Sequence, residues 1–256
     1  MLKVKIQWCD LDPIEPSALP EGAGMKIAIA LKTATDPLII TGYCGRNHST
    51  VGALVRLANL VPSLRVLDTG GSDMNFPADH PAWLSVRYGV HESILKADVI
   101  LVLDCDVPWI PTQCKPSKTA IIFHIDVDTL KSQMPLFYIP AIARYKADSF
   151  TSVSQIVKAA EEDADSLNME AKEALLRNRE NDYASHLAAL SDIYVPNEDG
   201  SFGTGHLCKT LRKLLPVDAI FAVEAVTVSS LLNLKSYDTI LSHLLQPIKQ
   251  FTDVLP

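Results

Sequence analysis

KADVILVLDCDVPW, residues 96–109, decides the fold of this chain together with TAIIFHIDVD, residues 119–128. In both stretches a short run of consecutive apolar residues is followed at once by carboxylates. Apolar residues at successive positions are typical of a strand that is covered on both faces, as in a parallel sheet. We therefore predict buried strands at residues 98–103 and 119–125.

Helical and strand patterns also alternate along the chain before these two strands. The elements predicted from spacing, proline and glycine are a helix at 24–35, a strand at 38–41, a helix capped by Ser49-Thr50, a strand at 64–67, a proline-rich loop at 75–83 and a helix end at 92–97. Strands that alternate with helices at this interval indicate parallel βαβ units. The predicted fold class is α/β, a doubly wound parallel sheet of Rossmann-like type.

The pattern changes at Ser149. A long helical stretch is predicted from there to about Leu190, followed by a turn, a helix at 206–215 and a strand at 219–223. About 33 residues remain after that strand, too few for a second sheet. The expected organisation is a linker (1–20), a central domain (21–150), a helical connector (151–200) and a truncated second α/β unit (201–256).

Composition excludes several classes of protein. The chain has 256 residues, of which 48% are hydrophobic and 21% charged, and this amount of apolar material excludes general disorder. Its net charge of −7 makes nucleic acid an unexpected partner. The start resembles no signal peptide, no apolar run could cross a membrane, and five widely spaced cysteines without Cys-x-x-Cys argue against disulfides or structural zinc. We expect a cytoplasmic protein without a membrane partner.

Acidic residues follow both buried strands, where ligands bind in open parallel sheets. Asp104 and Asp106 follow the first strand. His124, Asp126 and Asp128 would share one face of the second strand if it stays extended, and nitrogen and oxygen ligands of this kind can hold a metal ion. Alternatively, the acids cap turns and His124 is hydrogen-bonded in the core.

A glycine turn, Gly42–Gly45, precedes a predicted helix and could present backbone N–H groups to a phosphate, assisted by Arg46 and His48. It is not G-x-G-x-x-G and no Walker lysine follows, so a tight turn without a ligand is the alternative. No nucleophile motif is present. His80 lies in a rigid loop, where catalysis or a hydrogen bond that stabilises the turn would explain it. The residues alone therefore assign no catalytic residue and no metal ligand.

Several strings in order resemble the central domain of thiamine-diphosphate-dependent enzymes, within the acetolactate synthase and benzoylformate decarboxylase group. They are DPLIITGYCGRN (36–47), FPADHP (76–81), ADVILVL (97–103) and IDVD (125–128). The resemblance extends from about Leu19 to Asp148. The Arg-Phe-Asp-Asp-Arg string of the synthases that carry FAD is replaced here by DCDVPWIP (104–111), which argues against bound FAD.

LCKTLRKLLPVDAIFAVEAVT, residues 207–227, resembles the opening of the family's diphosphate-binding domain. The resemblance implies that Glu224 and Thr227 are the positions that help to hold the cofactor's diphosphate. It also implies that the pyrimidine-binding domain is missing and that the third domain ends before its Gly-Asp-Gly metal motif. NEDGSF (197–202) is similar to that motif, but it has Glu198 and precedes the strand, so we predict a turn there.

The resemblance therefore implies a central-domain fragment of a thiamine-diphosphate- and Mg²⁺-dependent 2-oxo acid carboligase or decarboxylase, similar to acetolactate synthase. Thiamine diphosphate and Mg²⁺ are not expected to bind tightly to this chain alone, and catalysis by it alone is not expected. Two alternatives stay open. One is a nucleotide-binding module at the Gly42 turn and the ends of the strands before Asp104 and Asp126. The other is an oligomerisation module that pairs with a second copy or with an intact paralogue.

Overall fold

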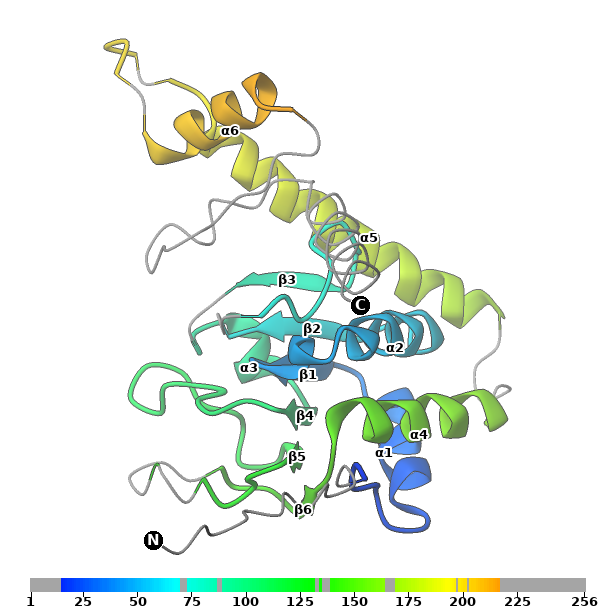
Figure 1. Ribbon diagram of the computed structural model, residues 1–256. Coiled ribbons are helices and arrows are strands. Elements are labelled where there is room, and N and C mark those ends of the chain that lie inside the picture. Colours follow the sequence, from blue (N-terminus) through cyan, green and yellow to red (C-terminus); the bar gives the residue numbers. More distant parts are fainter. Residues whose placement is uncertain are drawn as a thin grey trace, which may run out of the picture.

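The computed structural model describes residues 15–69, 73–86, 89–131, 134, 139–163, 169–196, 198–201 and 203–216. Its centre is one six-stranded sheet in which every neighbouring pair is parallel (Figure 1). The strands are β1 (Pro37–Thr41), β2 (Arg65–Asp68), β3 (Trp83–Val86), β4 (Val99–Leu103), β5 (Ile121–Asp126) and β6 (Ala143–Lys146). Their order across the sheet is β3-β2-β1-β4-β5-β6.

The strand order reverses between β1 and β4, which is the topology of a doubly wound sheet. All five residues of β1 and all five of β4 are buried, as expected for central strands that are covered on both faces. In the register Ile39 pairs with Val66 on one side and with Leu101 on the other. The predicted α/β class and both predicted strands at 98–103 and 119–125 are confirmed.

Helices cover the two faces of the sheet unequally. Helices α1 (Ala23–Thr33), α2 (His48–Leu60) and α4 (Ser149–Glu162) pack over one face, where the larger hydrophobic core lies (Figure 1). The short helix α3 (Glu92–Lys96) belongs to a smaller core on the other face, with Trp109 and Cys114 from the segment after β4. The three helices over one face bury apolar stripes at the spacing expected of an amphipathic helix.

The cap of α2 differs from the prediction. Asn47 is the N-cap, and its Oδ1 accepts a hydrogen bond from the Ser49 N–H at 3.1 Å. Ser49 and Thr50 lie inside the first turn, and Thr50 is fully buried. Asn47, Ser49 and Thr50 are all residue types suited to capping, which made the position ambiguous in the sequence, and the turn Cys44–Arg46 before the helix decides it.

Two strands were not predicted, and one predicted element is divided. Both β3 and β6 are four-residue strands at the edges of the sheet, and a short half-covered edge strand carries no long apolar run. The helical stretch predicted from Ser149 to about Leu190 is two helices in the described residues, α4 and α5 (Met169–Ile193). The predicted stripe is buried at Val153, Ile156, Val157 and Ala160, whereas Phe150 is partly exposed.

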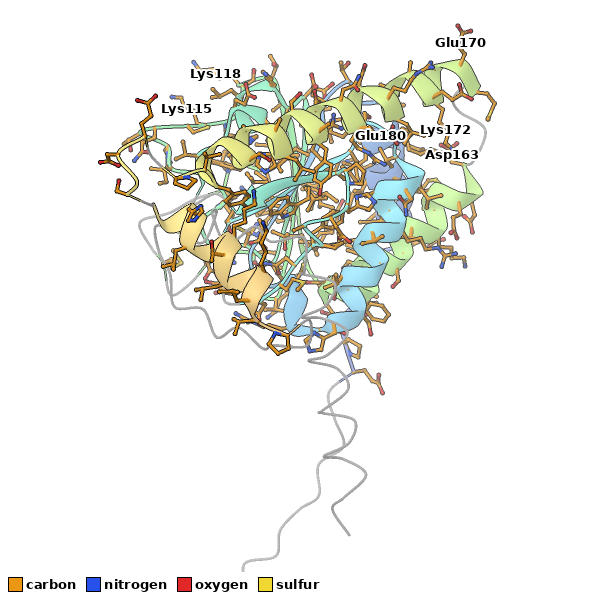
Figure 2. The ribbon with its side chains drawn as sticks, turned by 90° about the horizontal axis from the view of Figure 1, so that it is seen from above. Lys115, Lys118, Asp163, Glu170, Lys172 and Glu180 are labelled. Atoms are coloured by element: carbon orange, nitrogen blue, oxygen red, sulfur yellow. The ribbon has the colours of Figure 1, made fainter. Side chains whose placement is uncertain are left out.

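Helix α5 packs against the end of the sheet formed by β2 and β3 (Figure 1). Arg179 Nη1 donates to the Ala58 carbonyl oxygen at 2.6 Å, and the Tyr183 hydroxyl donates to the Ala78 carbonyl oxygen at 2.8 Å. Charged side chains such as Glu170 and Lys172 project from the outer surface (Figure 2). The hydrogen bonds of Arg179 and Tyr183 connect α5 to α2 and to the loop before β3.

The last described helix is α6 (Thr204–Leu214), which matches the helix predicted at 206–215. Residues 198–200 form a turn, and the Asp199 carboxylate accepts from the Ser201 N–H at 2.9 Å, as predicted for this segment. The strand at 219–223, with the rest of the predicted second unit after residue 216, and residues 1–14 of the linker lie outside the described residues. Within the described part of the chain no helix combines the length and apolar character needed to cross a membrane.

Candidate functional site

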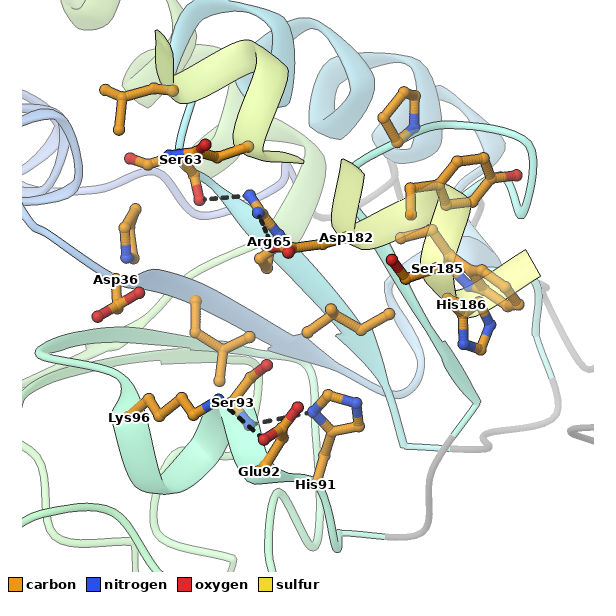
Figure 3. Close-up of a pocket in the computed structure, with 18 of the residues that line it drawn as sticks. Asp36, Ser63, Arg65, His91, Glu92, Ser93, Lys96, Asp182, Ser185 and His186 are labelled. Carbon is orange, nitrogen blue, oxygen red and sulfur yellow. Dashed lines mark hydrogen bonds and ion pairs between the residues drawn. The ribbon is translucent and has the colours of Figure 1, made fainter. Parts of the chain in front are cut away.

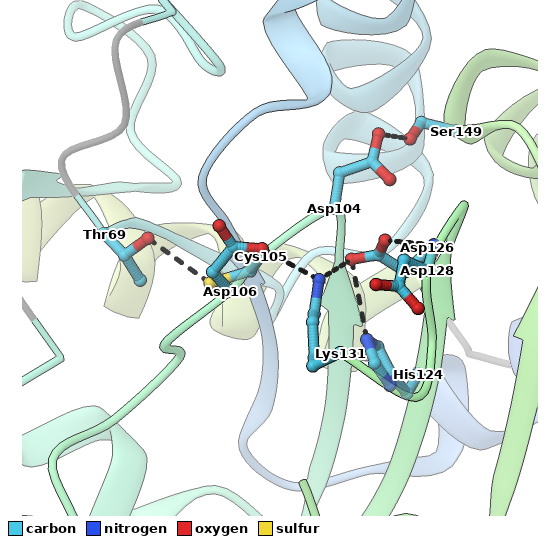
Figure 4. Close-up of polar contacts among 9 residues, drawn as sticks. All are labelled: Thr69, Asp104, Cys105, Asp106, His124, Asp126, Asp128, Lys131 and Ser149. Carbon is cyan, nitrogen blue, oxygen red and sulfur yellow. Dashed lines mark hydrogen bonds and ion pairs between the residues drawn. The ribbon is translucent and has the colours of Figure 1, made fainter. Parts of the chain in front are cut away.

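The carboxyl ends of β1, β4 and β5 bring together most of the residues that the sequence singled out. We call this region the carboxyl edge, and it comprises Gly42–Gly45, Asp104–Asp106 and Asp126–Lys131 (Figure 4). Because neighbouring parallel strands end at the same side of the sheet, the loops that follow them meet there. The sequence correctly predicted this convergence.

A buried lysine organises the carboxyl edge. Lys131 is 6% exposed, and its Nζ contacts Asp106 Oδ1 at 3.0 Å and also Asp126 Oδ2 (Figure 4). The lysine backbone has φ +49°, a left-handed conformation that is uncommon outside glycine. Sequence reasoning missed Lys131, since nothing in a lone lysine five residues after Asp126 shows that the turn folds it back over the edge.

Asp126 is ionised in this arrangement. Burial would raise the pKa of its carboxyl group, but the His124 and Lys131 side chains and the Asp128 N–H outweigh that effect and lower the pKa to about 2. The Asp128 N–H donates to Asp126 Oδ1 at 2.8 Å. Asp126 therefore stabilises the turn after β5, in agreement with the capping alternative.

His124 is fully buried on β5, and its Nε2 lies 3.7 Å from Asp126 Oδ2. That distance is too long for a hydrogen bond, and neither ring nitrogen has another partner within the described residues. The prediction of a core histidine is therefore right for its burial, but the expected hydrogen bond is not formed. The described residues contain no group of three His, Cys, Asp or Glu side chains arranged as metal ligands.

Asp104 is held separately from this cluster, although it follows the neighbouring strand. The Ser149 hydroxyl at the start of α4 donates to Asp104 Oδ2, while Oδ1 is buried without a partner among the described residues (Figure 4). Burial raises the pKa of Asp104, and the nearby Asp126 charge adds to that increase, against the Ser149 hydrogen bond. Its backbone has φ +41°, the second positive value at this edge.

The glycine turn has no free N–H groups at Gly42, Tyr43 or Gly45 with which to bind a phosphate. The N–H groups of Gly42 and Tyr43 both donate to the Asp104 carbonyl oxygen, at 3.2 and 2.9 Å. The Gly45 N–H donates to Asn75 Oδ1 at 3.0 Å. The structure therefore agrees with the alternative of a tight turn that holds no ligand.

Asn75, which the sequence analysis did not single out, ties this turn to β2. It is fully buried, and its Nδ2 donates to the Gly42 carbonyl oxygen at 3.1 Å and to Asp68 Oδ2 at 3.0 Å. Arg46 is exposed and lies over the Tyr43 ring, 4.5 Å from its centroid, and His48 is also exposed. The turn is thus a structural joint between β1, β2 and β4.

His80 has a structural position in the FPADHP loop. Its Nδ1 accepts from the Ala82 N–H at 3.0 Å, so its Nε2 carries the proton and donates to Asn59 Oδ1 at 3.1 Å. The ring also packs edge-on against Phe76 at 5.1 Å. Both nitrogens are occupied by hydrogen bonds within the fold, in agreement with the stabilising alternative and not with a catalytic role.

The stability of the protein should fall in mildly acidic solution because of His80. Burial and the Arg179 charge lower the pKa of His80 to about 4 from an ordinary 6.5, so the unfolded chain binds a proton first. The contribution of neutral His80 is complete above pH 6.5 and is lost as the pH falls towards 4. We expect a loss of about 2 kcal/mol between about pH 7.5 and about pH 5, measured by urea unfolding. A His80→Gln variant should show a shallower pH dependence, and an unchanged slope would contradict this assignment.

The described carboxyl edge does not fit a diphosphate. Asp104, Asp106, Asp126 and Asp128 crowd it, and its one described lysine is already paired with two of them. An added phosphate would meet carboxylates without a free cation to balance it. Glu224 and Thr227, the residues that the resemblance assigns to the diphosphate, lie outside the described residues.

Solved structures of two other proteins share this fold over most of the chain. The structure aligns with a thiamine diphosphate-dependent 4-hydroxybenzoylformate decarboxylase from Rhodococcus jostii RHA1 at a TM-score of 0.56 and 17% identity, over 88% of this chain and 40% of that one. It aligns with a protein from Mycobacterium smegmatis, described as thiamin diphosphate-dependent, at a TM-score of 0.51 and 16% identity, over 64% and 32% of the two chains. This chain is structurally similar to part of the thiamine-diphosphate-dependent decarboxylases.

The similarity predicted from the sequence strings is confirmed at the level of the fold. The chain spans 32–40% of the length of these two solved chains. No protein-family model matches it, and no curated protein matches it by sequence.

Proposed function

We propose that this chain forms the central-domain part of a thiamine-diphosphate- and Mg²⁺-dependent carboligase or decarboxylase that acts on 2-oxo acids, similar to acetolactate synthase. The observation that supports the proposal best is the agreement between the family's strings and the strand ends of a six-stranded parallel sheet. FPADHP leads into β3, ADVILVL contains the whole of β4, and IDVD begins at the end of β5. Each string therefore has a defined structural place.

The described residues would act in such an enzyme as a scaffold without direct contact to the cofactor. At their carboxyl edge Lys131 is already paired with Asp106 and Asp126, and the N–H groups of Gly42, Tyr43 and Gly45 already donate hydrogen bonds within the fold. Stabilising charge on a cofactor requires donors that are oriented towards it in advance, and the described edge offers none. We therefore propose that this chain alone is not catalytic.

Contacts to the cofactor would come from outside the described residues. We propose Glu224 and Thr227, in the part of the chain from 201 to 256, as the residues that approach the diphosphate. The remaining contacts would come from a second copy or a paralogue. A cytoplasmic location belongs to the same proposal, since the described cysteines Cys44, Cys105 and Cys114 are free thiols.

Calorimetric titration of the chain with thiamine diphosphate and MgCl₂ tests this proposal. We expect no heat from binding in the micromolar range, and no decarboxylation of pyruvate or benzoylformate above the background rate. Micromolar binding by the chain alone would contradict the proposed scaffold role. If binding did occur, its loss in a Glu224→Gln variant would locate the diphosphate.

The alternative of a nucleotide-binding module finds no support at the carboxyl edge. A nucleotide phosphate would need free backbone N–H groups in the Gly42–Gly45 turn. Those of Gly42, Tyr43 and Gly45 already donate to the Asp104 carbonyl oxygen and to Asn75 Oδ1. Thermal unfolding in the presence of ADP, FAD or coenzyme A should therefore show no stabilisation. A reproducible rise in melting temperature with one of them would favour the alternative.

A further inference from the structure

A pocket of about 610 Å³ lies at the amino ends of β1, β2 and β3, at the opposite end of the strands from the carboxyl edge (Figure 3). Helix α3 forms one wall and helix α5 forms the facing wall. Neither the resemblance nor the proposed function gives it a role. Its volume lies within the range of pockets that bind small molecules.

The interior of the pocket is partly apolar. The apolar lining comes from the start of β1 (Pro37 and Leu38) and from the start of β3 with the loop before it (Pro81, Trp83 and Leu84). Leu38 and Trp83 are buried, so this surface is fixed by the core beneath it. Such a surface favours the alkyl or aryl part of a ligand.

Both cations that line the pocket are already paired. Arg65 Nη2 contacts Asp182 Oδ2 at 2.6 Å, and Lys96 Nζ contacts Glu92 Oε2 at 2.8 Å (Figure 3). Arg65 Nη1 also donates to the Ser63 carbonyl oxygen at 3.0 Å. An incoming anion would have to break one of these pairs, so the pocket is a poor site for phosphate or carboxylate ligands.

One carboxylate of the pocket is unpaired. Asp36 is exposed, and its side chain forms no hydrogen bond or ion pair with any described residue. Its position is nevertheless defined, because the backbone N–H groups of Thr35 and Asp36 donate to the Asp98 carboxylate at 2.8 and 3.0 Å. Asp36 therefore lines the pocket from a backbone position that is fixed by hydrogen bonds, without a side-chain hydrogen bond or ion pair to another described residue.

The charges of Asp36 and Asp182 both act on Lys96. The pKa of Lys96 is raised, first by its hydrogen bond with Glu92 and then also by the charges of Asp36 and Asp182. The two carboxylates belong to different walls of the pocket, one before β1 and the other on α5. With three carboxylates, one arginine and one lysine, the lining has a formal excess of one negative charge.

We propose that this pocket binds a small alkylammonium cation, with the ammonium on the Asp36 carboxylate and the alkyl chain on Leu38 and Leu84. An ammonium group has three donors and no acceptor, which matches a carboxylate that has no hydrogen bond or ion pair with another described residue. The apolar interior accommodates the carbon chain. The chemistry is the same for a free amine and for the lysine side chain of another polypeptide.

Titration with n-butylamine, followed by NMR through the Trp83 indole signal, tests this site. We expect saturable binding in the millimolar range, and binding of n-butanol, which has the same shape without the charge, at least about fivefold weaker. Asp36→Asn should weaken butylamine binding about fivefold. Glu170→Gln is the matched control, since it removes one exposed carboxylate that does not line the pocket and should leave binding unchanged.

Two further ligands complete the experiment. Butyrate should not bind, and N-acetyl-lysine methylamide shows by its affinity relative to butylamine whether the site prefers a peptide-borne lysine or a free amine. Equal binding of butanol and butylamine, or equal effects of Asp36→Asn and Glu170→Gln, would overturn the proposal. Because neither thiamine diphosphate nor Mg²⁺ is present, this outcome is independent of the proposed function.

Discussion

Replacement of Lys131 by methionine should destabilise the protein by about 3 kcal/mol or more at neutral pH. The variant leaves Asp126, which is 4% exposed, as a buried carboxylate without its cation, and it removes the lysine partner of Asp106 as well. Removal of one partner from a buried pair is much more costly than loss of a surface pair, because the remaining charge stays desolvated. Equilibrium unfolding in urea measures this difference.

The pH dependence identifies the cause of the Lys131→Met effect. The folded pKa of Asp126, about 2, is below its ordinary 3.8, so its stabilising contribution is present above pH 3.8 and is lost as the pH falls towards 2. In the variant, burial acts on Asp126 without the lysine and raises its pKa. The carboxyl group is then protonated in mild acid, and the difference between variant and wild type should shrink below about pH 5.

Lys96→Met is the matched control for this experiment. Lys96 also contacts a carboxylate, Glu92, at 2.8 Å, but both side chains are more than 60% exposed. Its loss should leave the free energy of unfolding almost unchanged. Equal losses in the two variants, or a Lys131→Met effect that does not change with pH, would show that Lys131 does not stabilise the carboxyl edge by charge.

Gly45→Ala should destabilise the protein by about 2–4 kcal/mol. A Cβ atom at this buried position would overlap the Met74 carbonyl group, and a backbone carbonyl cannot move aside as the end of a side chain can. Movement of either segment would also stretch the hydrogen bond from the Gly45 N–H to Asn75 Oδ1. The joint between β1 and β2 would therefore loosen.

Gly52→Ala makes the same chemical change, but it should stabilise the protein. Gly52 is exposed on α2, and an added Cβ there meets no atom within 4 Å. Alanine should stabilise this helix by about 0.5–1 kcal/mol. Melting temperatures of the two variants should move in opposite directions, and a stabilised or neutral Gly45→Ala would refute the close approach described here.

Much of the central sheet could be predicted because its signal is local. Apolar residues at successive positions in β4 and β5 are buried only if other parts of the protein pack on both faces of the sheet. This requirement can be recognised from the sequence. The edge strands β3 and β6 were missed because they have partners on one side alone, and four residues of mixed polarity carry too little pattern. The family strings predicted the same fold from a different kind of evidence.

For the candidate site, the sequence predicted the position of the acidic residues but not their role. The sequence placed Asp104, Asp106, Asp126 and Asp128 at one end of the sheet, because parallel strands end together. It could not decide between metal ligands and turn caps, since both use the same residue types. That decision depends on Lys131, which folds back from the following turn and supplies the positive charge that a metal ion would otherwise have provided.

The amino-acid sequence by itself determined the α/β class, the buried central strands, the convergence of acids at the carboxyl edge and the likeness to thiamine-diphosphate-dependent enzymes. Each of these follows from periodicity or from the order of short strings, which are properties of neighbouring residues. The tertiary structure alone decided that the Gly42–Gly45 turn is closed by Asp104 and Asn75, and that an amino-end pocket holds an unpaired Asp36. Those features join residues 30 or more positions apart, and only the folded backbone brings such groups within a few ångströms of one another.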